Sequence, residues 1–464
     1  MSTPVFVVVG HVNRGKSSIV STLAADESVR IDPMPGTTRQ NREYPLRLGG
    51  ETLYKLVDTP GFERPRQVLA WLREHETGTG ERRQTVERFV HEHRVRQEFA
   101  QECELLEPVL GGGAILYVVD GSKPPSPKYE AEMEILRWTG QPRMALINPI
   151  DEADYLDSWR PILDQYFNLV RRFDSHEAGF DDRIALLKTL RELDEAWQPS
   201  VDRAIEALLA DRATGRRQSA EAIADLLVDA LTLTAEKRLG EDESADPHKK
   251  PLVARYQTKL RDREARCRRE LREIYLHESL EVAEPELDIL AEDLFSQATW
   301  NALGLSRVQL VAAGAAGGAA VGGGIDLAVG GASILAGTLI GGALGGAMGW
   351  LTGVQLPKTR VLGLPLGGKM LRVGPMTQAA FAWVLLDRAL LYHRAVSTRP
   401  HARRDAIHLE QGERQGLVAH LPGAVRGELE RIFARLRKSP SGETLDAARR
   451  ELAERIEEII GESG

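Results

Sequence analysis

The sequence predicts an α/β fold with a mostly parallel sheet in its first part and a mainly α-helical C-terminal module. Three observations support this prediction. Short apolar runs recur near the N-terminus, as expected of strands that are buried on both faces. Helix-like stretches separate these runs, which is typical of α/β sheets. Beyond residue 195, long charged or amphipathic stretches surround one glycine-rich apolar segment.

Length and composition limit the possible classes of protein. The 464 residues are enough for two or three domains. Charged residues make up 28% of the chain, and the net charge of -8 argues against a general nucleic-acid binder. Cys103 and Cys267 show no metal-ligand spacing and favour a reducing cytoplasm. The N-terminus has no basic region or cleavage site, so we expect no export.

The first apolar run leads directly into a phosphate-binding motif. Residues 5–9 form the run, and the chain continues GHVNRGKS, which fits GxxxxGK[ST]. In this motif the glycines, here Gly10 and Gly15, let backbone N–H groups wrap the phosphates. Lys16 would reach the β- and γ-phosphates, and Ser17 would ligate Mg²⁺. A chance match in a glycine turn would lack the strand and helix that flank the motif here.

Two downstream segments extend this site. The stretch YKLVDTPG places Asp58 at the end of a second apolar strand and Gly61 three residues later. Such an aspartate holds Mg²⁺ through water, and such a glycine donates its N–H to the γ-phosphate. Between them, PGTTRQ offers Thr37 and Thr38, one of which would close over Mg²⁺ and the γ-phosphate as a switch. REYPLRLGGETLYKLVD predicts a hairpin, and AILYVVD and RMALINP predict further buried strands.

The order of these motifs resembles the TrmE-Era-EngA branch of the translation-factor-related GTPases. GxxxxGKS, PGTTR, DTPG and NxxD follow one another between Gly10 and Asp151. The resemblance implies a P-loop G domain that binds GTP or GDP with Mg²⁺ and hydrolyses GTP. It also implies that Asn13 helps bind K⁺, which would neutralise transition-state charge beside the phosphates. The alternative is that Asn13 only tolerates a tight turn.

Three departures from the family pattern concern the base and the attacking water. INPID replaces NKxD: Asn148 and Asp151 keep their spacing, and Asp151 can accept hydrogen bonds from guanine N1 and N2, but Pro149 takes the place of the lysine. Guanine preference should survive, with weaker affinity. Phe62 follows DTPG and cannot orient water, so we expect slow intrinsic hydrolysis. FDSHEA stands at the distance expected of the base loop, and backbone groups of Ser175 or His176 would contact the base.

These motifs define the candidate site. The residues expected to act on the γ-phosphate are Lys16, Thr38, Gly61 and Asn13. Mg²⁺ is expected at Ser17, Thr38 and Asp58, and K⁺ at Asn13. The nucleotide would be held by Gly10, Asn13, Gly15, Lys16, Ser17, Ser18, Thr37, Thr38, Asp58, Gly61, Asn148, Asp151 and Ser175.

Helical stretches dominate two regions outside the motifs. Residues 62–113 contain charged, helix-like stretches, either a solvated insertion or an enlarged switch that couples the γ-phosphate to the C-terminal half. SAEAIADLLVDALTLTAEKRL predicts an amphipathic helix, and a basic helix follows. Its basic side chains form either a solvated face or a patch for anionic lipid or RNA: Lys259, Arg261, Arg263, Arg266, Arg268 and Arg269.

The glycine-rich segment predicts a helical hairpin. Small residues recur at steps of four along two arms, residues 308–321 and 327–354, so each arm carries a groove that permits close helix packing. Asp326 lies near the turn. The hairpin would either insert into a membrane or stay buried in a soluble domain. Farther on, RVLGLPLGGKMLRVGPM predicts two short strands, and FAWVLLDRALLYHRAV predicts a core helix before a basic cluster at residues 399–404.

The C-terminal half resembles a bacterial family in which an Era-like GTPase domain precedes a domain of unknown function. The glycine run and the LLDRAL…HARRD stretch carry this resemblance. We expect a G domain at 1–195 with a helical insertion at 62–113, a helical region at 196–306, the glycine-zipper hairpin at 307–356 and a C-terminal α(+β) region at 357–464.

The predicted function is that of a GTPase whose nucleotide state controls a helical effector module. The expected location is the cytoplasm, with peripheral or integral contact at the inner membrane. Expected partners are membrane lipid or a membrane protein and a nucleotide-dependent homodimer; nucleic acid or the ribosome is the weaker expectation. The alternative is a slow GTP-gated assembly or scaffold factor, linked to the ribosome or RNA, with the glycine hairpin buried.

Overall fold

The computed structural model describes most of the chain, which forms two compact units. The first unit extends to Arg212 and the second begins at Ala213. The described residues are 3–11, 15–24, 41–48, 50–94, 98–151, 154–240, 243–275, 351–356, 360–361, 364–365, 368–376, 379–398, 416–438 and 441–462.

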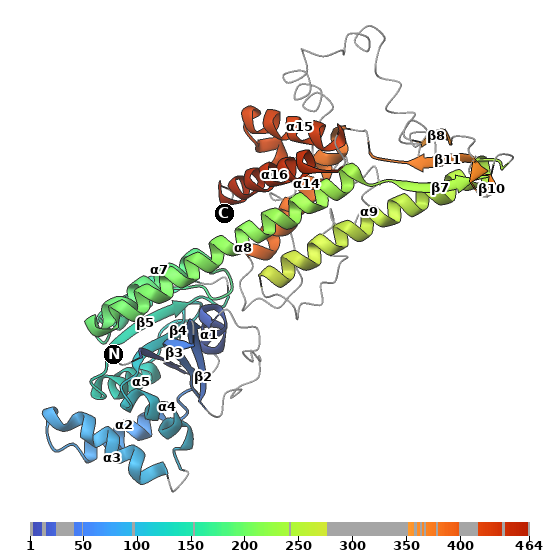
Figure 1. Ribbon diagram of the computed structural model, residues 1–464. Helices are drawn as coiled ribbons and strands as arrows, with labels where there is room; N and C mark the ends of the chain where they lie inside the picture. Colours follow the sequence, from blue (N-terminus) through green and yellow to red (C-terminus); the bar gives the residue numbers. More distant parts are fainter. Residues whose placement is uncertain are drawn as a thin grey trace. The chain divides into compact units, whose positions relative to one another are not determined.

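The first unit is built on a six-stranded sheet with the order β2-β3-β1-β4-β5-β6 (Figure 1). Every neighbouring pair is parallel except β2 and β3, which form the predicted hairpin. The prediction of a mostly parallel α/β fold is therefore confirmed. The strands are β1 (Val5–Gly10), β2 (Arg42–Leu48), β3 (Glu51–Asp58), β4 (Ala114–Asp120), β5 (Arg143–Asn148) and β6 (Leu169–Arg172).

Helices cover both faces of this sheet, because successive strand side chains point to opposite sides. Phe6 and Val8 of β1 pack with α1, α7 and the first turns of α8. Val7 and Val9 pack on the other face with α2 to α6. The helices are α1 (Lys16–Ala24), α2 (Pro65–Glu74), α3 (Arg82–Arg94), α4 (Ala100–Leu110), α5 (Pro127–Trp138), α6 (Leu156–Leu163), α7 (Phe180–Leu190) and α8 (Gln198–Thr232).

The segment between Phe62 and Gly113 belongs to the second of these helical layers. Val68 of α2, Phe89 of α3 and Leu105 of α4 are each fully buried in the same core as the sheet. Other side chains of the segment lie at the surface, where Arg83 and Arg88 form ion pairs with glutamates one turn away. The segment is therefore part of the core layer and not a surface appendage.

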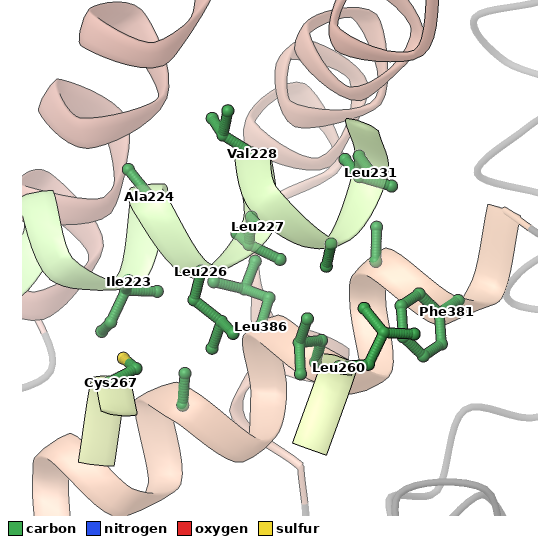
Figure 2. Packing of buried hydrophobic residues seen from close by; sticks show 14 of the residues in the cluster. Ile223, Ala224, Leu226, Leu227, Val228, Leu231, Leu260, Cys267, Phe381 and Leu386 are labelled. Carbon is green, nitrogen blue, oxygen red and sulfur yellow. The ribbon is translucent and has the colours of Figure 1, made fainter. Parts of the chain in front are cut away.

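Among the described residues of the second unit, helices α8, α9, α14, α15 and α16 contribute to one apolar core, part of which is shown in Figure 2. Ile223, Leu226 and Leu227 of α8 meet Cys267 of α9 and Leu386 of α14 in this core. The basic stretch is helical and the FAWVLL stretch is a core helix, as predicted. The additional helices of this unit are α9 (Asp246–Ile274), α14 (Ala379–Ser397), α15 (Gly423–Lys438) and α16 (Glu443–Glu462).

A small antiparallel sheet with the order β7-β11-β8 corrects two helix predictions. The AEKRL stretch was expected to extend an amphipathic helix but forms β7, and residues 351–354 were expected in the glycine hairpin but lie in β8. The central strand β11 pairs with both, and this long-range pairing overrides the local helical pattern. The strands are β7 (Ala235–Leu239), β8 (Leu351–Leu356), β9 (Arg360–Val361), β10 (Leu364–Pro365) and β11 (Gly368–Val373).

The glycine-rich segment before residue 351 and the basic cluster at 399–404 lie outside the described residues. Among the helices that the structure describes, none combines the length and apolar character that a membrane crossing needs. The predictions of a glycine hairpin and of membrane insertion therefore stay predictions.

Candidate nucleotide-binding site

Four parallel strands bring the predicted motifs to one edge of the first unit's sheet. Val8 of β1 is in register with Asp58 of β3, and Asp120 of β4 is in register with Asn148 of β5. The carboxyl ends of parallel strands lie at the same edge, where α/β proteins bind their ligands. The sheet therefore gathers the GxxxxGKS, DTPG and NxxD motifs in one place.

Both motif glycines occupy positions that a larger residue would strain. Gly10 has φ +149°, and a Cβ added there would lie 2.5 Å from the Val118 carbonyl oxygen. Gly15 has φ +77°, and a Cβ there would lie 2.1 Å from Nδ2 of Asn148. Glycines at these two points let the backbone pass close to β4 and to Asn148, as expected of the phosphate cradle that the motif predicts. The close approach of Gly15 to Asn148 also brings the phosphate motif against the base motif.

Lys16 and Ser18 stand in the first turn of α1. Lys16 is 7% exposed, and its Nζ donates a hydrogen bond to the backbone oxygen of His11 at 3.0 Å. The ammonium group therefore reaches back to His11, directly after β1, and it lies near the end of the helix where the dipole favours an anion. Ser18 is buried beside it.

Ser17 and Asp58 meet at the point predicted for Mg²⁺. The Ser17 hydroxyl donates to Oδ2 of Asp58 at 2.8 Å, and Asp58 is 2% exposed. The Thr59 hydroxyl donates to the Val8 carbonyl at 2.7 Å and fixes the DTPG turn to β1. A hydroxyl and a carboxylate oxygen form the hard donor set that Mg²⁺ prefers, so this pair fits the ion.

Gly61 and Phe62 follow directly on this turn. Gly61 is buried, and the backbone N–H of Phe62 donates to the Gly10 carbonyl at 3.3 Å. The Phe62 ring is fully buried among apolar residues of α2 and the sheet. Phe62 therefore serves the core, and its side chain offers no group that orients water.

The base side of the site centres on Asn148 and Ser175. Oδ1 of Asn148 accepts hydrogen bonds from the backbone N–H of Ser175 at 3.0 Å and from its hydroxyl at 3.1 Å. The Thr22 hydroxyl in α1 donates to the Ser175 carbonyl at 3.0 Å. The loop after β6 thus reaches both the NxxD motif and the helix that begins at Lys16. Its expected contact with the base stays a prediction. Asp151 is exposed at the same edge.

Three predicted site residues lie outside the described part of the chain: Asn13, Thr37 and Thr38. Their expected roles toward K⁺, Mg²⁺ and the γ-phosphate stay predictions.

A buried polar cluster that was not predicted from the sequence surrounds His11, the residue after Gly10. Glu132 of α5 is fully buried; its carboxylate lies 2.8 Å from Nδ1 of His11 and accepts the Tyr117 hydroxyl at 2.9 Å. Lys128 Nζ lies 3.3 Å from Nε2 of His11. The contacts anchor His11 to α5 and β4. The available signal was a glutamate within the otherwise apolar face of YEAEMEILRW.

Asp120 is a second residue at this edge of the sheet that was not predicted to belong to the site. Burial would raise the pKa of its carboxyl, but hydrogen bonds from Ser122 and Lys123 outweigh burial and lower the pKa below its ordinary value. Lys123 Nζ lies 3.0 Å from Oδ2 of Asp120. Asp120 therefore stays charged beside Asn148 and adds a fixed negative group to the base side.

Comparison with known proteins agrees with this geometry. The family described as 50S ribosome-binding GTPase matches residues 5–148. GTPase Der of Paraburkholderia phymatum is 29% identical over 152 residues, which are 33% of this chain and 28% of that protein. The tRNA modification GTPase MnmE of Chlorobium chlorochromatii is 45% identical over 56 residues, 12% of each chain. The chain thus spans less than a third of the length of either relative.

A structure comparison found a variant of Era from Aquifex aeolicus bound to GDP and AlF4⁻. The match has 17% sequence identity and a TM-score of 0.28, and it covers 59% of this chain and 90% of that one.

The sheet order, the two motif glycines and the family match over residues 5–148 define the first unit as a P-loop G domain, which is similar in sequence to parts of GTPase Der and MnmE. A second family match covers residues 160–460, more than half of the chain. The chain belongs to that family, which is described as "Domain of unknown function (DUF3482)".

Proposed function

We propose that the first unit binds GTP with Mg²⁺ and hydrolyses it to GDP and phosphate. The observation that carries this proposal is the packing of Asn148 against Gly15, which joins the base motif to the phosphate cradle in one site. The phosphates would lie along the cradle, with Lys16 released from His11 to contact them. Gly61 would donate its N–H to the γ-phosphate.

Mg²⁺ would be held by Ser17 and Asp58, with Thr38 as a further ligand expected from the sequence. When bound, the ion bridges phosphate oxygens and neutralises their negative charge. Phe62 leaves the chain without a side chain to orient water after DTPG, which supports slow intrinsic turnover. We therefore propose that K⁺ at Asn13, a partner or a second copy of the chain accelerates hydrolysis.

Asp151 would select guanine. A carboxylate can accept hydrogen bonds from both N1 and N2 of guanine, and adenine does not offer this pair of donors. Ser175, already held by Asn148, would present its backbone beside the base. Because Pro149 replaces the family's lysine, the base loses an ammonium group above it, and we expect weaker affinity without loss of preference.

The second unit would act as the effector of this nucleotide switch in the cytoplasm. Within the described residues, three candidate basic side chains of α9 pair with acidic ones: Arg263 with Asp229, Arg266 with Glu270 and Arg268 with Glu264. This pairing supports a solvated helix face over an RNA patch. For the second unit we favour the hypothesis that the glycine-rich segment contacts membrane lipid. The alternative hypothesis is a GTP-gated scaffold in which that segment is buried.

The nucleotide proposal is tested with the purified full chain. We expect GTP and GDP to displace a fluorescent GDP analogue at concentrations where ATP does not, and phosphate to be released from GTP in a Mg²⁺-dependent reaction. The Lys16→Ala variant should lose nucleotide binding. The Lys55→Ala variant should keep it, because Lys55 on β3 is paired with Glu43 on β2 at the surface. ATP competing as well as GTP would overturn the assignment of Asp151.

The effector proposal is tested by flotation of the full chain with anionic liposomes, loaded with GDP or a non-hydrolysable GTP analogue. Lipid binding in the GTP state is expected. If the chain bound no lipid in either nucleotide state, the membrane hypothesis would be wrong and the scaffold hypothesis would be favoured. Equal hydrolysis in K⁺ and Na⁺ would remove the role given to Asn13.

A further inference from the structure

Helix α4 carries a buried carboxylate that caps another helix. Glu102 is 1% exposed, and its Oε1 accepts hydrogen bonds from the backbone N–H groups of Glu63 at 3.0 Å and Arg64 at 2.6 Å. Arg64 is the N-cap residue of α2, and its side chain makes no capping bond. Glu102 therefore takes over the capping of α2 through charge-assisted hydrogen bonds, favoured by the dipole at this helix end.

Two residues further along α4, Glu104 holds a second segment of the chain. Oε1 of Glu104 accepts the backbone N–H of Asn41 at 2.9 Å, and the Asn41 side-chain amide donates to the Glu104 carbonyl at 2.6 Å. Asn41 directly precedes β2 and ends the stretch that contains PGTTRQ. One turn of α4 is thus bonded to the residue before the β2–β3 hairpin and to the residues after it.

Only a short stretch of backbone separates the contacts of Glu102 from the candidate site. Glu63 lies two residues after Gly61, and the intervening Phe62 donates its backbone N–H to Gly10 in the phosphate loop. A displacement of Gly61 toward a γ-phosphate would therefore pull directly on the N–H groups that Glu102 accepts. The capping residue lies 39 positions away from Glu63, so this link exists only when α4 is packed against the sheet.

We propose that Glu102 and Glu104 are positioning residues: through α4 they hold the turn after Gly61 in a fixed relation to Asn41 at the start of β2, so that the contact of Gly61 with a γ-phosphate depends on the 62–113 segment. The inference rests on the proposed function. A cap supplied by a neighbouring residue would stabilise α2 alone. Because the carboxylate comes from α4, the bonds that cap α2 also fix the loop after Gly61 relative to Asn41, and the 62–113 segment becomes part of the device that distinguishes GTP from GDP.

The test compares the affinities of the full chain for GDP and for a non-hydrolysable GTP analogue. GDP lacks the γ-phosphate, so Glu102→Ala should leave GDP affinity within about twofold of the original. The same change should lower the affinity for the GTP analogue and the hydrolysis rate by about tenfold, the effect of losing one charge-assisted contact. Glu102→Gln keeps an acceptor oxygen and should fall between the two.

Further variants separate this role from a general loss of stability. Glu104→Gln changes a half-buried side chain and should shift the same ratio of affinities without unfolding the chain. Glu107→Ala removes an exposed glutamate of the same helix and should change neither affinity. Glu102→Ala and Asn41→Ala should show non-additive effects on the ratio, because both act through α4.

Two results would overturn the proposal. If Glu102→Ala kept the original ratio of GTP-analogue to GDP affinity and the original hydrolysis rate, the positioning role would fall while the proposed function stood. If the unaltered chain bound no guanine nucleotide, the proposed function itself would fall, and the positioning role would fall with it.

Discussion

The side-chain oxygen of Asn148 accepts two hydrogen bonds from Ser175, one from its backbone N–H and one from its hydroxyl. Both residues are fully buried. The contact joins the end of β5 to the loop after β6 and makes the base side of the G domain a single unit before any nucleotide arrives.

This contact predicts unequal effects of two truncations. Ser175→Ala removes only the hydroxyl donor and should weaken GDP binding by no more than about tenfold, the worth of one neutral hydrogen bond. Asn148→Ala leaves a buried N–H without its acceptor and should cost about 1–3 kcal/mol of unfolding free energy as well. Titration with GDP and thermal denaturation measure both effects. Ser126→Ala, at a position without a capping bond, is the control, and equal effects of the two variants would contradict the prediction.

The phosphate cradle should reject even one methyl group. Gly15 has φ +77°, where an L-residue costs about 1–2 kcal/mol, and an added Cβ would overlap Nδ2 of Asn148. Gly15→Ala should therefore weaken nucleotide binding at least about tenfold and lower the melting temperature. Gly78→Ala, where an added Cβ has no neighbour within 4 Å, should be neutral. Unchanged GDP affinity in Gly15→Ala would show that the cradle does not contact phosphate.

The pair Ser17 and Asp58 should set the requirement for Mg²⁺. Ser17→Ala removes one oxygen donor, so about tenfold more Mg²⁺ should be needed for half-maximal GTP hydrolysis, as for the loss of one contact. Asp58→Asn removes the negative charge and should have a larger effect. Phosphate release measured across a Mg²⁺ titration checks both, and a chelator should stop the reaction. Asp157→Asn, an exposed position, should titrate like the unaltered chain.

Asp387 should make the stability of the second unit depend on pH. It is fully buried on α14, and burial raises the pKa of its carboxyl from 3.8 to about 7, even though Val418 donates a backbone hydrogen bond to it at 3.1 Å. Between these values the folded unit holds a proton that the unfolded chain releases. Stability should therefore fall as pH rises from about 4 to 7, by on the order of 4 kcal/mol in total.

Denaturation of the full chain at pH 5 and pH 8 measures this dependence. Asp387→Asn, which carries no titratable proton, should flatten it, whereas Asp262→Asn at an exposed position should not. A pH profile that the Asp387→Asn variant leaves unaltered would assign the dependence to other groups.

The sequence predicted which motifs meet at one edge of the sheet, because each motif follows a strand and parallel strands end at the same edge. Gly15, Lys16, Ser17, Asp58 and Asn148 lie where this reasoning places them. The burial of Glu102 was not predicted, because one glutamate among many in a charged stretch gives no sign that its carboxylate is buried. Its partners, Glu63 and Arg64, become visible only once α4 is packed.

The second unit shows where local patterns fail. The AEKRL stretch carries charged residues that suit a helix, and nothing near it in the sequence indicates pairing. Its partner is β11, with Ala235 opposite Val373, so the strand is specified by residues far along the chain. The helices α9 and α14 were predictable because their apolar spacing is local.

The register of β7 with β11 has a consequence for the order in which the molecule folds. During synthesis the strands of the first unit emerge early and can find one another, whereas β7 must wait until Gly368–Val373 has left the ribosome. Contacts between such distant segments form slowly, and an unpaired strand edge invites aggregation meanwhile. A fragment that contains β7 but stops before Gly368 should therefore aggregate more readily than the full chain. Fragments of proteins in this family should keep the second unit as one continuous chain.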